Sequence, residues 1–170
     1  MHKVEFNRVV SLSDKPLVGM RRSMSLQQNT TAELWRSFMP RRREINDRVS
    51  EALFSVQDLS DCGGFKQFSP AAVFEKWAAV EVSASQGPVP EGMERFLVPS
   101  GDYAVSDHCG PPSEFGKTQH YIFSQWLPAS NYELDERVHF ELLQPEWRAD
   151  DPNASEEVWI PVRERGVRTQ

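Results

Sequence analysis

The sequence predicts an α+β fold in which helices pack on an antiparallel sheet. Short segments with alternating apolar and polar residues recur along the chain, and they indicate strands. Two other segments place their apolar residues at helical spacing, and a proline follows each of them. The two helical segments also match each other at a constant offset of 88 residues. This match predicts a duplicated β-α-β-β unit, with two helices packed on the sheet around a central cleft.

The length of 170 residues predicts a single domain, 1–170, with pseudo-repeats at about 1–85 and 92–165. The matching segments are 34–40 and 122–128, which both contain an apolar, an aromatic, two polar, an aromatic and an apolar residue, and then proline. The offset between them is too long for a solenoid repeat and is typical of a domain with pseudo-two-fold symmetry.

The first half begins with strand patterns and continues into a helix. Strands are expected at 4–12, 17–20, 52–56 and in the second half of 73–82. The helix is expected to start at a capping box, Thr30 to Glu33, and either to end at Pro40 or to begin its exit there.

The second half shows the same order of elements. Residues 93–105 are expected to form a strand, a turn and a strand. A helix is expected to run from a cap at Ser113 to Pro128, and strands at 138–143 and 158–162. Pro161 favours an edge position for the last strand, because proline has no N–H for a neighbouring strand.

Charge and motif content exclude several classes of protein. The net charge of −6 disfavours direct binding to nucleic acid. The chain contains no apolar segment long enough to cross a membrane and no apolar leader, so a cytoplasmic protein is expected. Cys62 and Cys109 are expected to be reduced, and the four histidines lack the spacing of a metal site. No metal or cofactor is therefore expected.

Aromatic residues make up 11% of the chain. Each alone is most simply a core residue, but two helices with matched aromatic positions over one sheet would also form an aromatic-walled cleft. Such clefts suit flat, lipophilic or cationic ligands. The aromatic candidates for ligand binding are Trp35, Phe38, Trp77, Tyr103, Tyr121 and Trp126.

Two carboxylates interrupt apolar strand patterns. Alternation places Glu141 and His139 on one face of their strand and Phe140 on the other. If the face with Glu141 meets solvent, this residue is an ordinary surface glutamate. If the face lines a cleft, the desolvated carboxylate would attract a cation and have a raised pKa. Glu81, between Val80 and its following valine, carries the same argument more weakly.

The chain resembles the GyrI-like small-molecule-binding domain, which is also the effector-binding part of AraC-type and MerR-type drug-responsive regulators. The residues that carry the resemblance are 74–82, 99–105, His108, Gly110, Thr118, 121–123, 126–128 and 138–141. The resemblance implies the duplicated unit and a ligand site at its pseudo-two-fold axis. It also implies that Glu141 contacts cationic aromatic drugs and that aromatic side chains surround them. No helix-turn-helix precedes the first predicted strand, so a stand-alone member is expected.

Three functions are compatible with this resemblance. The first is a binding protein for lipophilic, cationic aromatic compounds. The second is a hydrolase of electrophilic cyclopropane-containing drugs, with Glu141 as general base and His139 or Tyr103 as helper. The third is an interaction with a protein partner, such as DNA gyrase or a regulator. Turnover of the ligand would distinguish the second from the first, and activity without Glu141 would favour the third.

Overall fold

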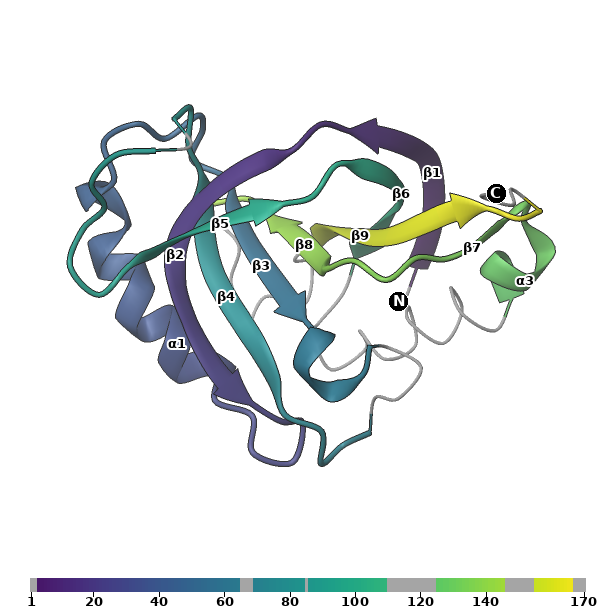
Figure 1. The fold of residues 1–170 in the computed structure, drawn as a ribbon, viewed down its shortest axis with the longest axis horizontal. Coiled ribbons are helices and arrows are strands. Elements are labelled where there is room, and N and C mark those ends of the chain that lie inside the picture. Colours follow the sequence, from purple (N-terminus) through teal and green to yellow (C-terminus); the bar gives the residue numbers. More distant parts are fainter. Residues whose placement is uncertain (1–2, 65–68, 85, 110–124, 146–154, 167–170) are drawn as a thin grey trace.

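The structure is a computed structural model that describes residues 3–64, 69–84, 86–109, 125–145 and 155–166. In this part of the chain, nine strands form one antiparallel sheet in the order β1-β6-β9-β8-β3-β4-β2-β5, with β7 paired to β9 (Figure 1). The strands are β1 Lys3–Leu12, β2 Lys15–Met24, β3 Leu53–Asp58, β4 Phe74–Glu81, β5 Glu94–Val98, β6 Gly101–Cys109, β7 Tyr132–Leu134, β8 His139–Leu143 and β9 Ser155–Glu164. The helical elements are α1 Thr31–Phe38, η1 Met39–Glu44, η2 Ser60–Cys62 and α3 Leu127–Ala129. The predicted α+β class with an antiparallel sheet is confirmed.

The sheet is sharply curved (Figure 1). We call the face that carries Tyr103, Phe140 and Trp159 the inner face, and the face on which α1 packs the outer face. Side chains from β2, β3, β4, β6, β8 and β9 meet on the inner face in one buried cluster. The ring of Tyr103 on β6 lies 5.4 Å from that of Phe140 on β8 and 6.0 Å from that of Trp159 on β9. Because side chains alternate along each strand, the neighbours of these residues point to the outer face.

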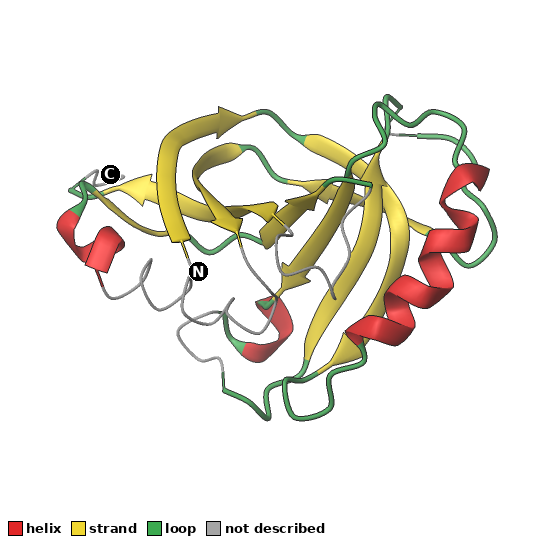
Figure 2. Cartoon of the chain, turned by 180° about the vertical axis from the view of Figure 1, so that it is seen from behind, coloured by secondary structure: helices red, strands yellow, loops and turns green. Residues whose placement is uncertain are grey.

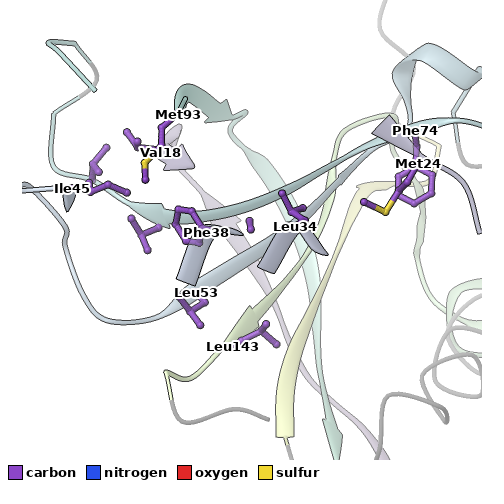
Figure 3. Close-up of a cluster of buried hydrophobic side chains, with 12 residues drawn as sticks. Val18, Met24, Leu34, Phe38, Ile45, Leu53, Phe74, Met93 and Leu143 are labelled. Atoms are coloured by element: carbon purple, nitrogen blue, oxygen red, sulfur yellow. The ribbon is translucent and has the colours of Figure 1, made fainter. Parts of the chain in front are cut away.

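Helix α1 covers one half of the outer face and runs alongside β4 and β2 (Figure 2). Its Leu34 and Phe38 are buried in a cluster with Val18, Ala78 and Val80 (Figure 3). The helical stripe predicted from the sequence is therefore the packing face of α1. A second apolar cluster on the outer face joins β6 and β9 to α3.

The ends of α1 differ from the prediction. The predicted capping box is wrong, since Thr30 makes no side-chain capping bond. Instead, the Asn29 side-chain oxygen accepts hydrogen bonds from the backbone N–H and the hydroxyl of Thr31, at 3.0 and 2.5 Å. Pro40 does not end the helical segment, which continues as the 3₁₀ helix η1. Proline is accepted there because the first turn of a helix has no partner for its N–H.

The predicted edge position of Pro161 is also wrong, because β9 pairs with β6, β8 and β7. The Pro161 carbonyl accepts a hydrogen bond from the Asp135 N–H at 3.0 Å. In a strand, the N–H and C=O of one residue point to the same neighbour. The position without an N–H therefore faces the side of β9 on which β8 and β7 pair. On that side β8 pairs with β9 as far as Trp159, and β7 pairs with it from Val162 onward, so no ladder hydrogen bond is lost at Pro161.

Each half of the chain provides a strand to the edge of the other half. β1 pairs with β6, and β5 pairs with β2. The second predicted helix falls largely within 110–124, which lie outside the described residues. The duplicated β-α-β-β unit therefore stays a prediction.

Glycine is expected to be required at position 101, the start of β6, because of its backbone conformation and its contact with Arg137. Its φ is +147°, and a Cβ there would overlap the Arg137 guanidinium. Arg137 is held by the Asp135 carboxylate and the Asp102 and Val162 carbonyls, at 2.9, 2.6 and 3.1 Å. We expect Gly101→Ala to lower the free energy of unfolding by about 1–3 kcal/mol in urea titration.

Gly166 provides the control for this substitution. It also has a positive φ, +78°, but nothing lies within 4 Å of the position that a Cβ would take. Gly166→Ala should therefore show only the backbone cost of about 1 kcal/mol. Equal losses in the two variants would show that the Arg137 contact is unimportant.

Candidate functional site

Polar side chains cross the outer face of the sheet between its two apolar clusters. The strand registers place six of them on this face: Lys76, Gln57, His139, Glu141, Glu156 and His108. We call this set the outer strip. It extends from β4 through β3, β8 and β9 to β6, which is the centre of the strand order. A strip of this kind between packed apolar clusters needs partners for its charges.

Glu141 lies at the middle of the outer strip and is 9% exposed. Gln57, on the neighbouring strand β3, donates a hydrogen bond from Nε2 to Glu141 Oε1 at 3.2 Å. Burial raises the pKa of Glu141, whereas the positive charge of Lys76 and the hydrogen bond from Gln57 oppose the rise. Glu141 is thus a desolvated carboxylate with one neutral donor.

Lys76 and Glu156 complete the ionisable part of the strip. Burial lowers the pKa of Lys76, which is 9% exposed, and the charges of Glu141 and Glu156 oppose this change. Burial and the charge of Glu141 raise the pKa of the partly buried Glu156 to about 8, and Lys76 opposes this rise. The charge of Lys76 is thus influenced by two carboxylates, those of Glu141 and Glu156.

His139 lies on the outer face, opposite Gln57 in the register of β3 and β8. Burial and the positive charge of Arg137 lower its pKa to about 4. At pH 7 the imidazole is consequently neutral and contributes no charge to the outer strip.

Three predicted site residues lie on the inner face instead, away from Glu141. The Trp77 ring packs against that of Phe96 at 4.9 Å, and Tyr103 is fully buried in the inner cluster. Glu81 accepts a hydrogen bond from the Lys15 ammonium at 3.0 Å. The structure therefore does not bring these residues together with the outer strip.

The remaining aromatic candidates lie on or near the helical elements. Phe38 is fully buried beneath α1, and the partly buried Trp35 meets it edge-on at 6.0 Å between ring centroids. Trp126 belongs to the outer-face cluster of β6 and β9, and its ring is parallel to that of Tyr132 at 6.5 Å. Tyr121 lies outside the described residues.

Lys76, Glu156 and Gln57 were not among the site residues predicted from the sequence. For the two charged residues, the burial of their neighbours on the same face could have indicated a role. Lys76 shares its face with Phe74, Ala78 and Val80, all of which are buried. Glu156 has the parity of the buried residues of β9, Val158 and Ile160. Glu141, by contrast, was identified as a charge between two apolar neighbours, Phe140 and Leu142.

A hollow of about 570 Å³ lies beside β5, β7 and the start of β8, and His139 of the outer strip is one of its lining residues. Two of its arginines are held in ion pairs: Arg137 binds Asp135 at 2.9 Å, and Arg163 binds Glu133 at 2.9 Å. The described residues contain no cluster of metal-binding side chains. Among the helices that the structure describes, none is both long and apolar enough to cross a membrane.

Comparison with known proteins gives one family and one curated relative. The family described as the GyrI-like small molecule binding domain matches residues 7–163. The transcriptional regulator BrlR of Pseudomonas aeruginosa is 31% identical over 157 residues, which cover 91% of this chain and 54% of BrlR. The chain thus spans about half the length of this relative.

Solved structures share the fold at low sequence identity. The C-terminal domain of EcmrR matches with a TM-score of 0.69 and 11% identity, covering 96% of this chain and 99% of that one. SAV2435 bound to tetraphenylphosphonium matches with a TM-score of 0.63 and 13% identity, covering 94% of each chain.

Proposed function

Because the chain belongs to the family of GyrI-like small-molecule-binding domains, we propose that it binds lipophilic, cationic aromatic compounds over the outer strip. Glu141 is the charged contact, and Trp35 and Trp126, which pack against the two apolar clusters of the outer face, are the aromatic contacts. The observation that carries this proposal is the buried carboxylate of Glu141, which is 9% exposed and has Glu156 as a diagonal neighbour on the same face. An organic cation would balance that charge and bury its rings at the same time.

A pair of ions with the same shape tests the proposal. Tetraphenylphosphonium and tetraphenylborate are nearly equal in size and opposite in charge, so any difference in affinity reports the charge of the site. We expect the phosphonium to bind in the micromolar range in a calorimetric titration and the borate not to bind. Glu141→Gln should weaken phosphonium binding at least tenfold, or about 1.4 kcal/mol.

Glu81→Gln is the matched control. Glu81 also interrupts an apolar strand, but it lies on the inner face and is paired with Lys15. This variant should bind the phosphonium as the wild type does. Equal affinity for the two ions, or equal losses in the two variants, would contradict the proposal.

A hydrolytic role would use the same carboxylate, since the raised pKa of buried Glu141 suits a general base. Incubation with an electrophilic cyclopropane-containing compound, followed by mass spectrometry, separates this role from binding. Product formed by the wild type and not by Glu141→Gln would assign turnover to this site. Recovery of unchanged compound would leave binding as the activity.

The position of the outer strip agrees with the duplicated unit that the sequence predicts. β3 and β8 are adjacent at the centre of the strand order, and corresponding strands follow on either side: β4 and β9, then β2 and β6, then β5 and β1. A pseudo-two-fold axis between β3 and β8 would pass beside Gln57 and Glu141. The proposed ligand would then lie on this axis.

A further inference from the structure

The charged cluster of the outer strip contains two carboxylates, Glu141 and Glu156, and one ammonium group, Lys76, so with all three ionised its net charge is −1. Lys76 comes from β4, Glu141 from β8 and Glu156 from β9. Val158, two residues after Glu156, is opposite Glu141 in the register, so the two glutamates are diagonal neighbours on the same face. Lys76 and Glu141 are each only 9% exposed. Lys76 interacts electrostatically with both glutamates, and the partly buried Glu156 also interacts with Glu141.

Four other polar groups lie near this cluster on the outer face, one on each of β8, β3, β2 and β6. His139 on β8 is neutral at pH 7, because its pKa is about 4. Gln57 on β3 is uncharged, and Arg22, which lies opposite Lys76 on β2, is exposed to solvent. His108 on β6 lies opposite Glu156 and is buried. Among the described residues, His108 is therefore the one further group whose protonation has to be tested.

A buried excess of negative charge is costly, so an empty site with a charged lysine should retain a proton on one of the two carboxylates. Glu156 is the better holder of that proton, since Glu141 already accepts a hydrogen bond from Gln57 that stabilises its ionised form. We infer that Glu156 determines the charge specificity of the site by holding a proton while the site is empty and releasing it to solvent when an organic monocation binds. This inference rests on the proposed function.

The exchange balances in charge and atoms. The Glu156 carboxylic acid loses one proton to water, and the resulting carboxylate is neutralised by the incoming cation. The site remains neutral before and after binding, which selects a monocation over a dication or a neutral compound. The pKa of about 8 for Glu156 means that the proton is present at pH 7.

Proton release gives cation binding a definite pH dependence. Protons and cations compete for the site, so affinity should rise about tenfold per pH unit below the pKa of Glu156 and level off above it. With a pKa of about 8, the rise should occupy the range from pH 6 to 8.

Calorimetric titration of tetraphenylphosphonium in phosphate and in Tris buffer at pH 7 measures the number of protons released. We expect about one proton per cation bound to the wild type and about none for Glu156→Gln, whose affinity should not change between pH 6 and 8. Glu157→Gln is the matched control and should retain proton release, because this adjacent carboxylate points to the other face and accepts a hydrogen bond from Trp159 Nε1 at 3.2 Å. His108→Gln removes the other titratable neighbour in the outer strip and tests whether the proton comes from that residue.

The outcomes separate this inference from the proposed function. Cation binding without proton release by the wild type would overturn the inference and leave the proposed function intact. Release that survives in Glu156→Gln, or that is lost in His108→Gln, would assign the proton to another group and also overturn it. Absence of any phosphonium binding would overturn both.

Discussion

Replacement of Gly19 by alanine is expected to cost more than about 4 kcal/mol of unfolding free energy. Gly19 on β2 lies opposite Ala79 of β4 on one side and Glu94 of β5 on the other. A Cβ at Gly19 would overlap the Ala78 carbonyl oxygen and lie 2.6 Å from the Ala79 Cα. These are backbone atoms of a paired strand, so they cannot move without breaking the β2–β4 ladder. Urea unfolding followed by far-UV circular dichroism measures the loss.

Two comparisons make this prediction specific. Gly64→Ala introduces a Cβ with nothing within 4 Å, and should cost only about 1 kcal/mol for its φ of +88°. Ala79→Gly in the Gly19→Ala background removes one side-chain contact and leaves the Ala78 carbonyl in place, so it should not restore stability. Recovery in this double variant would show that the overlap involves only side chains.

Replacement of Lys76 by methionine should destabilise the protein in a pH-dependent way. The substitution leaves Glu141 and Glu156 buried without an ammonium partner, which costs about 3–5 kcal/mol when both carboxylates are ionised. The pKa values of both are raised in the folded protein. Carboxylates of this kind contribute stability at low pH that is lost as pH rises through the folded pKa. The loss in Lys76→Met should therefore be large at pH 8 and small at pH 5, as measured by urea unfolding.

The double variant Lys76→Met/Glu141→Gln is the control for this prediction. It removes one carboxylate together with the ammonium, so most of the stability at pH 8 should return. A loss in Lys76→Met that is equal at pH 5 and pH 8 would indicate lost packing of the lysine side chain, and not unbalanced charge. Added tetraphenylphosphonium should also stabilise Lys76→Met more than wild type at pH 8, because the cation replaces the missing ammonium.

Strand positions could be predicted from the sequence because β-branched and aromatic residues recur with period two. The assignment of faces could not, because the sheet is buried on both sides. In β4 the run from Trp77 to Val80 is buried at every position, so alternation does not tell which parity faces α1. Trp77 and Tyr103 were predicted as ligand contacts from the aromatic content and the family resemblance, whereas the strand registers place them on the inner face with Phe140.

The candidate site was predicted only in part. Glu141 attracted attention as a charge in an apolar strand, and the family resemblance supported it. Lys76 and Glu156 each stand next to another charged residue in the sequence, and their relation to Glu141 depends on the strand order, in which β9, β8, β3 and β4 are consecutive. The sequence around one strand can show that a charged residue faces the core. It cannot show which residue of a distant strand lies next to that charge.

The exchange of edge strands between the halves has a consequence for the order of folding. β1 leaves the ribosome long before its partner β6, which begins only at Gly101. β2 likewise gains its second neighbour only when β5 is made. Neither half can complete its hydrogen-bonded sheet alone, so closure depends on contacts between residues far apart in sequence. Such topologies fold in milliseconds to seconds, and unpaired strand edges that are exposed in that time favour aggregation.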